Sequence, residues 1–248
     1  MFAFERGRYR VREASAPSDF DAIQDLRSRS FKADRNRSPD ADRFDDICTQ
    51  FMIEDHEEGR LICSFRTLML DGGEAIGQTY SSQFYDLSAL TAYSGPLLEI
   101  GRFCVDPLTN DPDLLRLAWG ALASVVDENG VRLLFGCSSF QGLDPEPYLD
   151  AFALLRARHL APQEWRPKVK SNDVFDFTLR IGTHSNHAGA NAQLPPLLKT
   201  YLLMGGWVSD HAVIDAEMNT LHVFTGVEVN NIPETRKKLL RSVVAGAA

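Results

Sequence analysis

The 248-residue chain has few cysteines, no long apolar run and no excess of positive charge. Its four cysteines form no C-x-x-C pair and lack metal-ligand spacing, so we expect no metal site and reduced thiols in apolar surroundings. No segment reaches about 18 apolar residues, so no membrane-spanning helix is predicted. The net charge of −8 argues against nucleic acid as a partner, because phosphate binding needs a basic surface.

Several sequence motifs are also missing. The chain has neither glycine pattern that cradles a nucleotide phosphate, G-x-x-x-x-G-K-[ST] or G-x-G-x-x-G, and no G-x-S-x-G nucleophile elbow. The first residues, MFAFERGRYR, hold no long apolar core, so no signal peptide is expected. These absences predict a cytoplasmic protein and leave open a peripheral contact with the inner face of the membrane.

The order of the predicted elements indicates an α/β protein with a mixed central sheet flanked by helices. Apolar spacing predicts helices over 18–31, 114–126 and 145–160 and strands over 51–55, 61–70, 97–106 and 131–140. Strand, helix and strand follow one another between 97 and 140, which favours a βαβ unit. We expect a single domain over 1–248, with a less regular segment at about 161–193.

The strand LLEIGRFCVD at 97–106 carries two charges inside an apolar run. Glu99 and Arg102 would point to opposite faces of a regular strand. Gly101 lies between them, and a glycine within a strand often marks a β-bulge. A bulge there would bring both charges towards one face and free a backbone N–H, so this strand is a candidate catalytic site.

Other charged residues recur in apolar surroundings. Arg27 lies on the helix that carries Phe31, Asp42 and Asp45 precede the first predicted hairpin, and Arg66 interrupts the strand SFRTLML. One interpretation is a buried ion-pair network that holds a loop to the sheet. The other is a substrate site, and the two interpretations are compatible.

Together these residues form a recognisable pattern. Arg27-x-x-x-Phe31, Asp42-x-x-Asp45, Arg66 in SFRTL and Glu99-x-x-Arg102 in LEIGRF resemble the acyl-homoserine-lactone synthases, a GNAT-like superfamily. A longer resemblance, through LEIGRFCVDP, LLFGCSSF, PPLLKTYLLMGG and AVIDAEMNTLHVF, is to the ornithine N-acyltransferase (hemolysin-like) family. That family usually has Ser where Phe103 stands and Gly where His211 stands.

The resemblance implies a GNAT-like fold and transfer of a 3-hydroxyacyl chain from acyl carrier protein to the α-amine of L-ornithine, the first step of ornithine-lipid synthesis. No cofactor is expected beyond the acyl-acyl carrier protein co-substrate. Glu99 would be the base, and the N–H near Gly101 an oxyanion donor. Arg102 and Arg66 would hold Glu99, the ornithine carboxylate or the loop acids. Asp42 or Asp45 would receive the side-chain ammonium, or pair with Arg27 instead.

The donor is expected to be a carrier protein rather than coenzyme A. The stretch after the catalytic strand, DPLTNDPDLLRLAW, offers aspartates where coenzyme A enzymes of this fold carry a glycine-rich pyrophosphate loop. Acyl carrier protein is acidic, so a basic dock is expected. The candidates, with only Glu164 opposing them, are Arg156, Arg158, Arg166, Lys168 and Lys170. A solvated helix face is the alternative, and contact with anionic lipid headgroups is also left open.

Two other functions remain as alternatives from the sequence. The first is an acyl-homoserine-lactone synthase using S-adenosylmethionine, or another amino-acid N-acyltransferase. The second is a non-catalytic acyl-carrier or lipid-binding module, which the presence of both Glu99 and Arg102 disfavours.

Overall fold

A computed structural model describes residues 2–31, 40–181 and 189–245. The chain forms two compact units. Unit 1 contains residues 1–69, 100–131 and 234–248, and unit 2 contains 70–99 and 132–233. The prediction of a single acyltransferase domain over 1–248 stays a prediction. No helix in the described part of the chain is long and apolar enough to cross a membrane.

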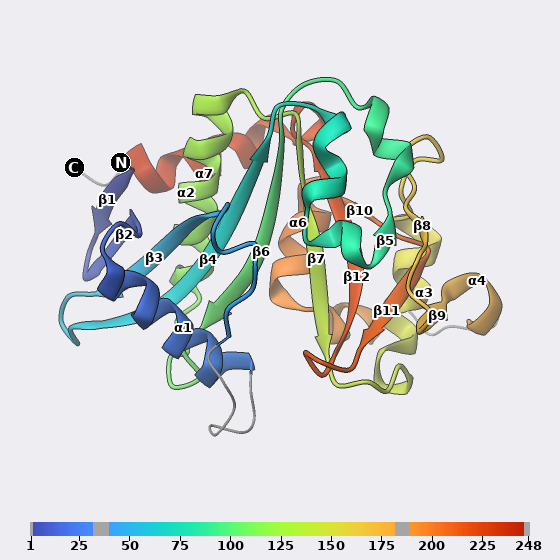
Figure 1. The fold of residues 1–248 in the computed structure, drawn as a ribbon, viewed down its shortest axis with the longest axis horizontal. Coiled ribbons are helices and arrows are strands. Elements are labelled where there is room, and N and C mark those ends of the chain that lie inside the picture. Colours follow the sequence, from blue (N-terminus) through green and yellow to red (C-terminus); the bar gives the residue numbers. More distant parts are fainter. Residues whose placement is uncertain (1, 32–39, 182–188, 246–248) are drawn as a thin grey trace. The chain divides into compact units, whose positions relative to one another are not determined.

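Unit 1 combines a meander of strands with three helices (Figure 1). Its strands, which pair in the order β1-β2-β3-β4-β6, are β1 (Ala3–Arg6), β2 (Tyr9–Glu13), β3 (Thr49–Asp55), β4 (Arg60–Leu70) and the second part of β6 (Leu97–Val105). The helices are α1 (Pro17–Phe31), α2 (Asp113–Asn129) and α7 (Glu234–Ala245). Helices α2 and α7 pack closely, because a Cβ on Gly120 would lie only 2.7 Å from Val243.

Unit 2 is built on strands that begin with the first part of β6 and continue in the order β7-β12-β11-β9. Its elements are β5 (Tyr85–Asp86), β7 (Leu133–Gln141), α3 (Leu149–Arg158), β8 (Lys168–Val169), β9 (Val174–Asp176), α4 (Phe177–Arg180), α5 (Ala190–Gln193), α6 (Pro196–Leu203), β10 (Trp207–Val208), β11 (His211–Asp215) and β12 (Thr220–Glu228). Strands β6 and β7 are parallel, and β7, β12 and β11 are antiparallel. The order β6-α2-β7 confirms the predicted βαβ unit.

The two faces of the unit 2 strands have different coverings. Phe140, Val223 and Phe152 of α3 belong to one apolar core. On the other face lies a segment of three short 3-10 helices and β5, residues 73–93, which we call the covering segment (Figure 1, green-blue). It reaches this face through hydrogen bonds to Glu99 and His222. The covering segment, whose fold was unclear from sequence, therefore shields the face that carries Glu99.

Strand β6 departs from regular geometry within the LEIGRF stretch. Its parallel pairing with β7 ends at Glu99, opposite Phe135. The residue with left-handed backbone geometry is Arg102, at φ 50°, whereas Gly101 does not lie in that region. The positive φ therefore lies at Arg102, next to Gly101, and the predicted bulge at Gly101 stays a prediction.

Other sequence predictions agree with the structure to within a few residues, with three corrections. The segment 145–160 begins with a short 3-10 turn and α3 ends at Arg158, because His159 already leaves helical geometry. The described part of 161–193 holds two short strands and two four-residue helices, and 182–188 lie outside the described residues. The final helix α7 was not predicted.

Candidate active site

Arg27 anchors a network of buried charges in unit 1. Its side chain is only 1% exposed. Nη1 donates to Asp45 Oδ1 at 2.8 Å, and Nη2 donates to Gln50 Oε1 at 2.6 Å. The Gln50 amide donates in turn to the same Asp45 oxygen at 2.9 Å. Helix α1, strand β3 and the segment before it are therefore joined by charge-assisted hydrogen bonds.

Arg66 of β4 joins both aspartates. Its Nη1 donates to Asp42 Oδ1 at 2.6 Å and to Asp45 Oδ1 at 2.7 Å, and its Nη2 donates to Asp42 Oδ2 at 2.8 Å. Arg102 Nη2 donates to Asp42 Oδ2 at 3.0 Å, and Arg102 Nε lies 3.2 Å from Asp40 Oδ2. The structure thus brings together the predicted residues Arg27, Asp42, Asp45, Arg66 and Arg102.

The charges in this network stabilise one another. Burial opposes ionisation of Asp45, but the charges and hydrogen bonds of Arg27 and Arg66 prevail and lower its pKa to about 2. Burial likewise opposes ionisation of Asp42, while Arg66 and Arg102 hold its pKa below the usual value. The buried-network interpretation is therefore correct, and the binding of substrate by these residues stays a prediction.

Two predicted residues lie beside the network. Phe31 is the last residue of α1 and is half-buried. A Cβ on Gly101 would lie 3.6 Å from Arg66 Nε, an ordinary contact distance. A Cβ at this position would therefore fit beside Arg66 without displacing it. The oxyanion role of Gly101 stays a prediction.

Glu99 belongs to unit 2 and has a different kind of partner. The side chain is buried, and its carboxylate accepts hydrogen bonds from the covering segment. Tyr80 N donates to Oε2 at 2.9 Å, while Ser81 N and Ser81 Oγ donate to Oε1 at 2.7 and 2.6 Å. Such donors favour the ionised carboxylate. The predicted role of Glu99 as the base stays a prediction. Whether Glu99 and Arg102 face one tunnel stays a prediction.

Other reactive side chains share the face that carries Glu99. Register places Glu99 opposite Phe135, and Cys137 follows two residues later on the same face. Ser81 Oγ lies 3.5 Å from Cys137 Sγ. Burial, followed by the proximity of Cys137 and Glu99, raises the pKa of Tyr201. The predicted role of Cys137 in packing, without a nucleophilic step, stays a prediction.

Two buried histidines lie farther along this face. Tyr85 OH donates to the His222 carbonyl at 2.8 Å and lies 3.1 Å from His222 Nδ1. His211 Nδ1 lies 2.8 Å from Asp210 Oδ1. Burial lowers the pKa of His222 to about 4 despite the attraction of Asp215. His222 is consequently neutral at neutral pH.

The start of α2 in unit 1 is rich in paired acids. Asp106 is buried, with Arg29 Nη1 at 2.5 Å and Arg60 Nη1 at 3.1 Å. Tyr9 OH donates to Asp111 Oδ2 at 2.5 Å, and this bond contributes most to lowering the pKa of Asp111. Paired acids therefore precede α2, and the expected preference for a carrier protein over coenzyme A stays a prediction.

The predicted docking cations are not equivalent. Arg156 Nη1 donates to the Ile181 carbonyl at 2.9 Å, and Arg166 Nη2 donates to the Ala161 carbonyl at 2.9 Å. Arg158, Lys168 and Lys170 are exposed. Lys168 is opposite Asp86 in the β5–β8 pair, so Glu164 is not the only opposing acid. A common dock for all five cations stays a prediction.

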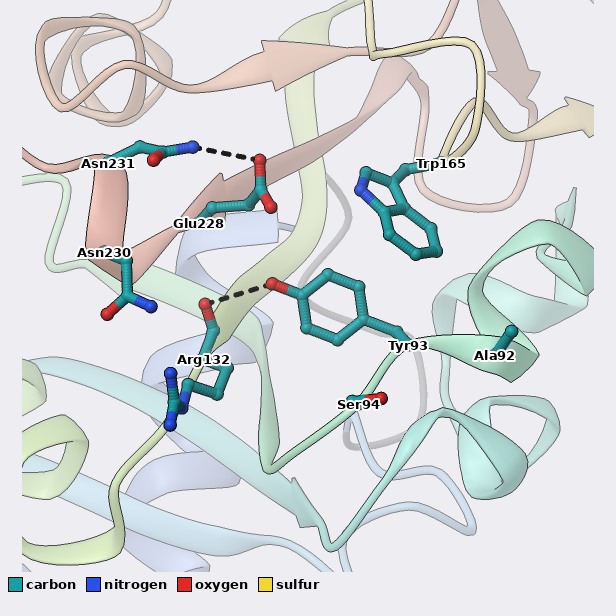
Figure 2. A pocket seen from close by; sticks show the side chains of 8 residues that line it. All are labelled: Ala92, Tyr93, Ser94, Arg132, Trp165, Glu228, Asn230 and Asn231. Carbon is teal, nitrogen blue, oxygen red and sulfur yellow. Dashed lines mark hydrogen bonds between the residues drawn. The ribbon is translucent and has the colours of Figure 1, made fainter.

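A pocket of about 350 Å³ opens where β6 and β7 begin in unit 2 (Figure 2). Its lining is Ala92, Tyr93, Ser94, Arg132, Trp165, Glu228, Asn230 and Asn231. The Tyr93 and Trp165 rings meet edge to face with centroids 4.9 Å apart. Asn231 Nδ2 donates to Glu228 Oε2 at 3.1 Å. None of the predicted site residues lines this pocket.

Sequence reasoning missed the donors of Glu99 and the amide that completes the ion-pair network. Ser81 lies in QTYSSQF, which gives no periodic signal, and its partner is 18 residues away. Gln50 lies in a strand that was identified, yet nothing in its sequence surroundings indicates Arg27 as a partner. The one sequence signal for Gln50 is that it is a polar residue next to the apolar run FMI, where burial is expected.

Known proteins share sequence similarity with this chain. The model of the acetyltransferase (GNAT) domain family matches residues 26–120, the stretch that holds the ion-pair network, Ser81 and Glu99. The L-ornithine N(alpha)-acyltransferase of Rhodobacter capsulatus is 29% identical over 252 residues, covering 96% of each chain. The enzyme of the same name from Brucella abortus is 28% identical over 91% of this chain and 86% of its own.

Solved structures agree on the fold. FeeM, an N-acyl amino acid synthase from uncultured soil microbes, superposes with a TM-score of 0.52 at 13% identity, over 90% of this chain and 93% of its own. BjaI, a coenzyme A-dependent acyl-homoserine lactone synthase, gives 0.50 at 12% identity, over 98% and 90%. The chain therefore has the predicted GNAT-like α/β fold, and its sequence resembles L-ornithine N(alpha)-acyltransferases along nearly its whole length.

Proposed function

We propose that this protein is an acyltransferase that moves a 3-hydroxyacyl chain from acyl carrier protein to the α-amine of L-ornithine. The observation that carries the proposal is the full-length similarity to enzymes named L-ornithine N(alpha)-acyltransferase, which spans both units. The buried Glu99 and Arg66 and the half-buried Arg102 supply the acid–base and anion-binding groups that such a reaction needs.

The chemistry is aminolysis of a thioester. The neutral amine nitrogen attacks the carbonyl carbon, a C–N bond forms, and the C–S bond breaks to release the carrier thiol. Glu99, directly or through water, accepts the proton that the ammonium loses before attack and releases it to solvent. The second proton, which the nitrogen loses once the C–N bond has formed, passes to the leaving thiolate. A backbone N–H of β6 stabilises the tetrahedral oxyanion. No acyl-enzyme is required, so Cys137 needs no covalent role.

The charged network positions the acceptor. Arg102, whose guanidinium is paired with Asp42, attracts the ornithine carboxylate or keeps the acids in place. Asp42 and Asp45 stay ionised, so they attract an ammonium electrostatically even while paired with arginines. This division of roles between Arg102 and the two acids is part of the proposal.

The acidic start of α2 favours a carrier protein as the donor. Asp106 and Asp111 are held in place by Arg29 and Tyr9, so they would repel the pyrophosphate of coenzyme A. The exposed cations Arg158, Lys168 and Lys170 fit an acidic carrier. A cytoplasmic location, with the lipid product passing to the membrane, fits this proposal.

The decisive experiment is expression in a host that lacks ornithine lipid, followed by mass spectrometry of the lipids. A new lyso-ornithine lipid is expected. The purified protein is then given acyl-acyl carrier protein with either ornithine or S-adenosylmethionine. Product only from S-adenosylmethionine would replace the proposal with a homoserine-lactone synthase, and a different amino acid in the lipid would replace ornithine. Absence of turnover with every amine would indicate a non-catalytic binding module.

A further inference from the structure

The covering segment that binds Glu99 is itself held by the strand that carries the exposed lysines. Strand β5 pairs with β8, with Tyr85 opposite Val169 and Asp86 opposite Lys168. Ser171 N donates to the Phe84 carbonyl at 3.1 Å, which continues this pairing. The position of residues 84–86 in unit 2 is therefore tied to β8.

Lys170 adds a bond nearer to Glu99. Its Nζ donates to the Ser82 carbonyl at 2.6 Å, although Lys170 is exposed. Ser82 Oγ donates back to the Thr79 carbonyl at 2.7 Å, so this turn is compact. Ser81, the residue next to Ser82, supplies two of the donors to Glu99. Only one peptide unit therefore separates the lysine contact from the groups that hold the carboxylate.

An acidic partner would compete for this lysine. A carboxylate or phosphate is a stronger acceptor for an ammonium than a neutral carbonyl is. Hydrogen bonds from Ser88 lower the pKa of Asp86, and the charges of Lys168 and Lys170 add to this effect. Acids and lysines therefore already meet at β8. Engagement of Lys170 by an acidic protein would weaken its bond to Ser82 and loosen the turn.

Loosening the turn changes the chemistry of Glu99. Hydrogen bonds from Ser81 stabilise the ionised carboxylate and so make it a weaker base. Ser81 is fully buried, and water cannot replace its hydroxyl without entering the site. A turn that moves away from β6 therefore leaves a carboxylate that takes up a proton more readily.

We propose that Ser81 and Lys170 are positioning residues that keep Glu99 weakly basic until an acidic carrier protein engages β8. This inference rests on the proposed function, and it adds that docking of the donor and activation of the base are coupled through the covering segment. It predicts that the lysine acts even when no carrier is present.

The test uses a donor that cannot dock. The full-length protein acylates ornithine from a 3-hydroxyacyl-pantetheine thioester, and kcat/KM is measured against pH for Ser81→Ala and Lys170→Gln. The acidic limb should move up by about one pH unit in both variants. The advantage of the carrier-bound donor over the pantetheine donor should fall several-fold. Because all variants use the same ornithine, ionisation of the substrate amine cancels.

Matched variants distinguish positioning from a structural role. Ser81→Thr keeps the hydroxyl and Lys170→Arg keeps a cationic donor, so both should restore the wild-type pH profile. Lys238→Gln removes an exposed lysine in unit 1 and should not shift it. Lys170 is exposed, so its variants should fold even where Ser81→Ala does not.

The outcomes separate the two proposals. An active wild-type protein whose pH profile is unchanged by both Lys170→Gln and Ser81→Ala overturns the coupling and leaves the proposed function standing. A wild-type protein that acylates ornithine from neither donor overturns both. A lower rate without a shift of the acidic limb shows a structural role and also overturns the coupling.

Discussion

The two units bury their polar groups in opposite ways. In unit 1, arginines and aspartates of opposite charge satisfy one another, with Arg27 and Arg66 almost fully buried. In unit 2, the buried carboxylate of Glu99 is bound by N–H and hydroxyl groups, and the paired side chains of Tyr85 and His222 are neutral. A charged side chain paired with an opposite charge is held in its ionised form by that partner. The basicity of a charged side chain held by neutral donors changes when those donors move.

This difference suggests where regulation and where rigidity lie. The unit 1 network joins α1, β3 and β4 through several charge-assisted hydrogen bonds. Loss of one partner therefore leaves the remaining charges buried and unpaired. The Glu99 donors come from a covering segment with little regular structure, attached through a two-residue strand pair. The predictions below test this contrast, starting with the largest expected effect.

Replacement of Glu99 by Gln should reduce kcat by about 10²-fold or more, since a general base contributes that much. The fold should change little, because Gln keeps the shape and can still accept from Ser81. Steady-state acylation of ornithine and a denaturant titration measure the two effects. Glu146→Gln, an exposed glutamate in the same unit, is the control. Turnover near the wild-type value would remove Glu99 from the base role.

Arg66→Met should lower the free energy of unfolding by about 3–5 kcal/mol, because Asp42 and Asp45 lose a shared buried partner. The matched control Arg241→Met breaks an exposed pair with Asp127 and should cost about 1 kcal/mol or less. Urea unfolding followed by circular dichroism measures both. Equal losses for the two variants would contradict the view that unit 1 depends on its buried network.

Acid should weaken the two units in different pH ranges. The pKa of His222 falls from 6.5 to about 4 on folding, so the folded state binds fewer protons between these values. The stability that His222 contributes is present above pH 6.5 and is lost as the pH falls to about 4, up to about 3 kcal/mol. The pKa of Asp45 falls from 3.8 to about 2, so its contribution is lost only below about pH 4.

Hydrogen exchange between pH 7 and 3 separates these two losses. Strands β11 and β12 should lose protection first, and strands β3 and β4 at lower pH. His222→Gln should flatten the stability profile between pH 6.5 and 4. Loss of protection in β3 and β4 before β12 would show that the assignment of the two pH ranges is wrong.

The smallest effect is expected at the docking surface. Lys168→Glu combined with Arg158→Glu should raise the KM for acyl-acyl carrier protein several-fold at low salt, and less at high salt. The KM for a pantetheine donor should stay unchanged. Lys238→Glu makes a comparable charge change in unit 1 and serves as control. An unchanged carrier KM would indicate that these cations form a solvated face.

Sequence patterns predicted most of the regular elements, because helices and strands each have a characteristic local spacing of apolar residues. Helix α2 and strand β4 follow from spacing alone. The backbone irregularity of β6 was placed at Gly101 because glycine is the common marker. The left-handed residue is Arg102, whose side chain is held by an ion pair with Asp40 and a hydrogen bond to Asp42.

The site was only partly predictable for the same reason. Arg27, Asp42, Asp45, Arg66 and Arg102 were identified as charges in apolar surroundings, and such charges must find partners wherever the chain folds. Which acid meets which arginine could not be read, because the partners are 18 to 60 residues apart. Ser81 could not be found at all, since a serine in an irregular segment carries no local signal.

By itself, the sequence determined that charges would be buried together in strands of an α/β acyltransferase-like fold. Arg and Glu within apolar runs are buried with the run, and a buried charge needs a polar partner. Only the tertiary structure decided how those charges are satisfied. In unit 1, arginines from α1 and β4 and aspartates from the segment before β3 neutralise one another. In unit 2, the covering segment turns its N–H groups and a buried hydroxyl towards Glu99. Hydrogen bonding depends on distance and angle in space, and those are set by packing between segments that are remote in the chain.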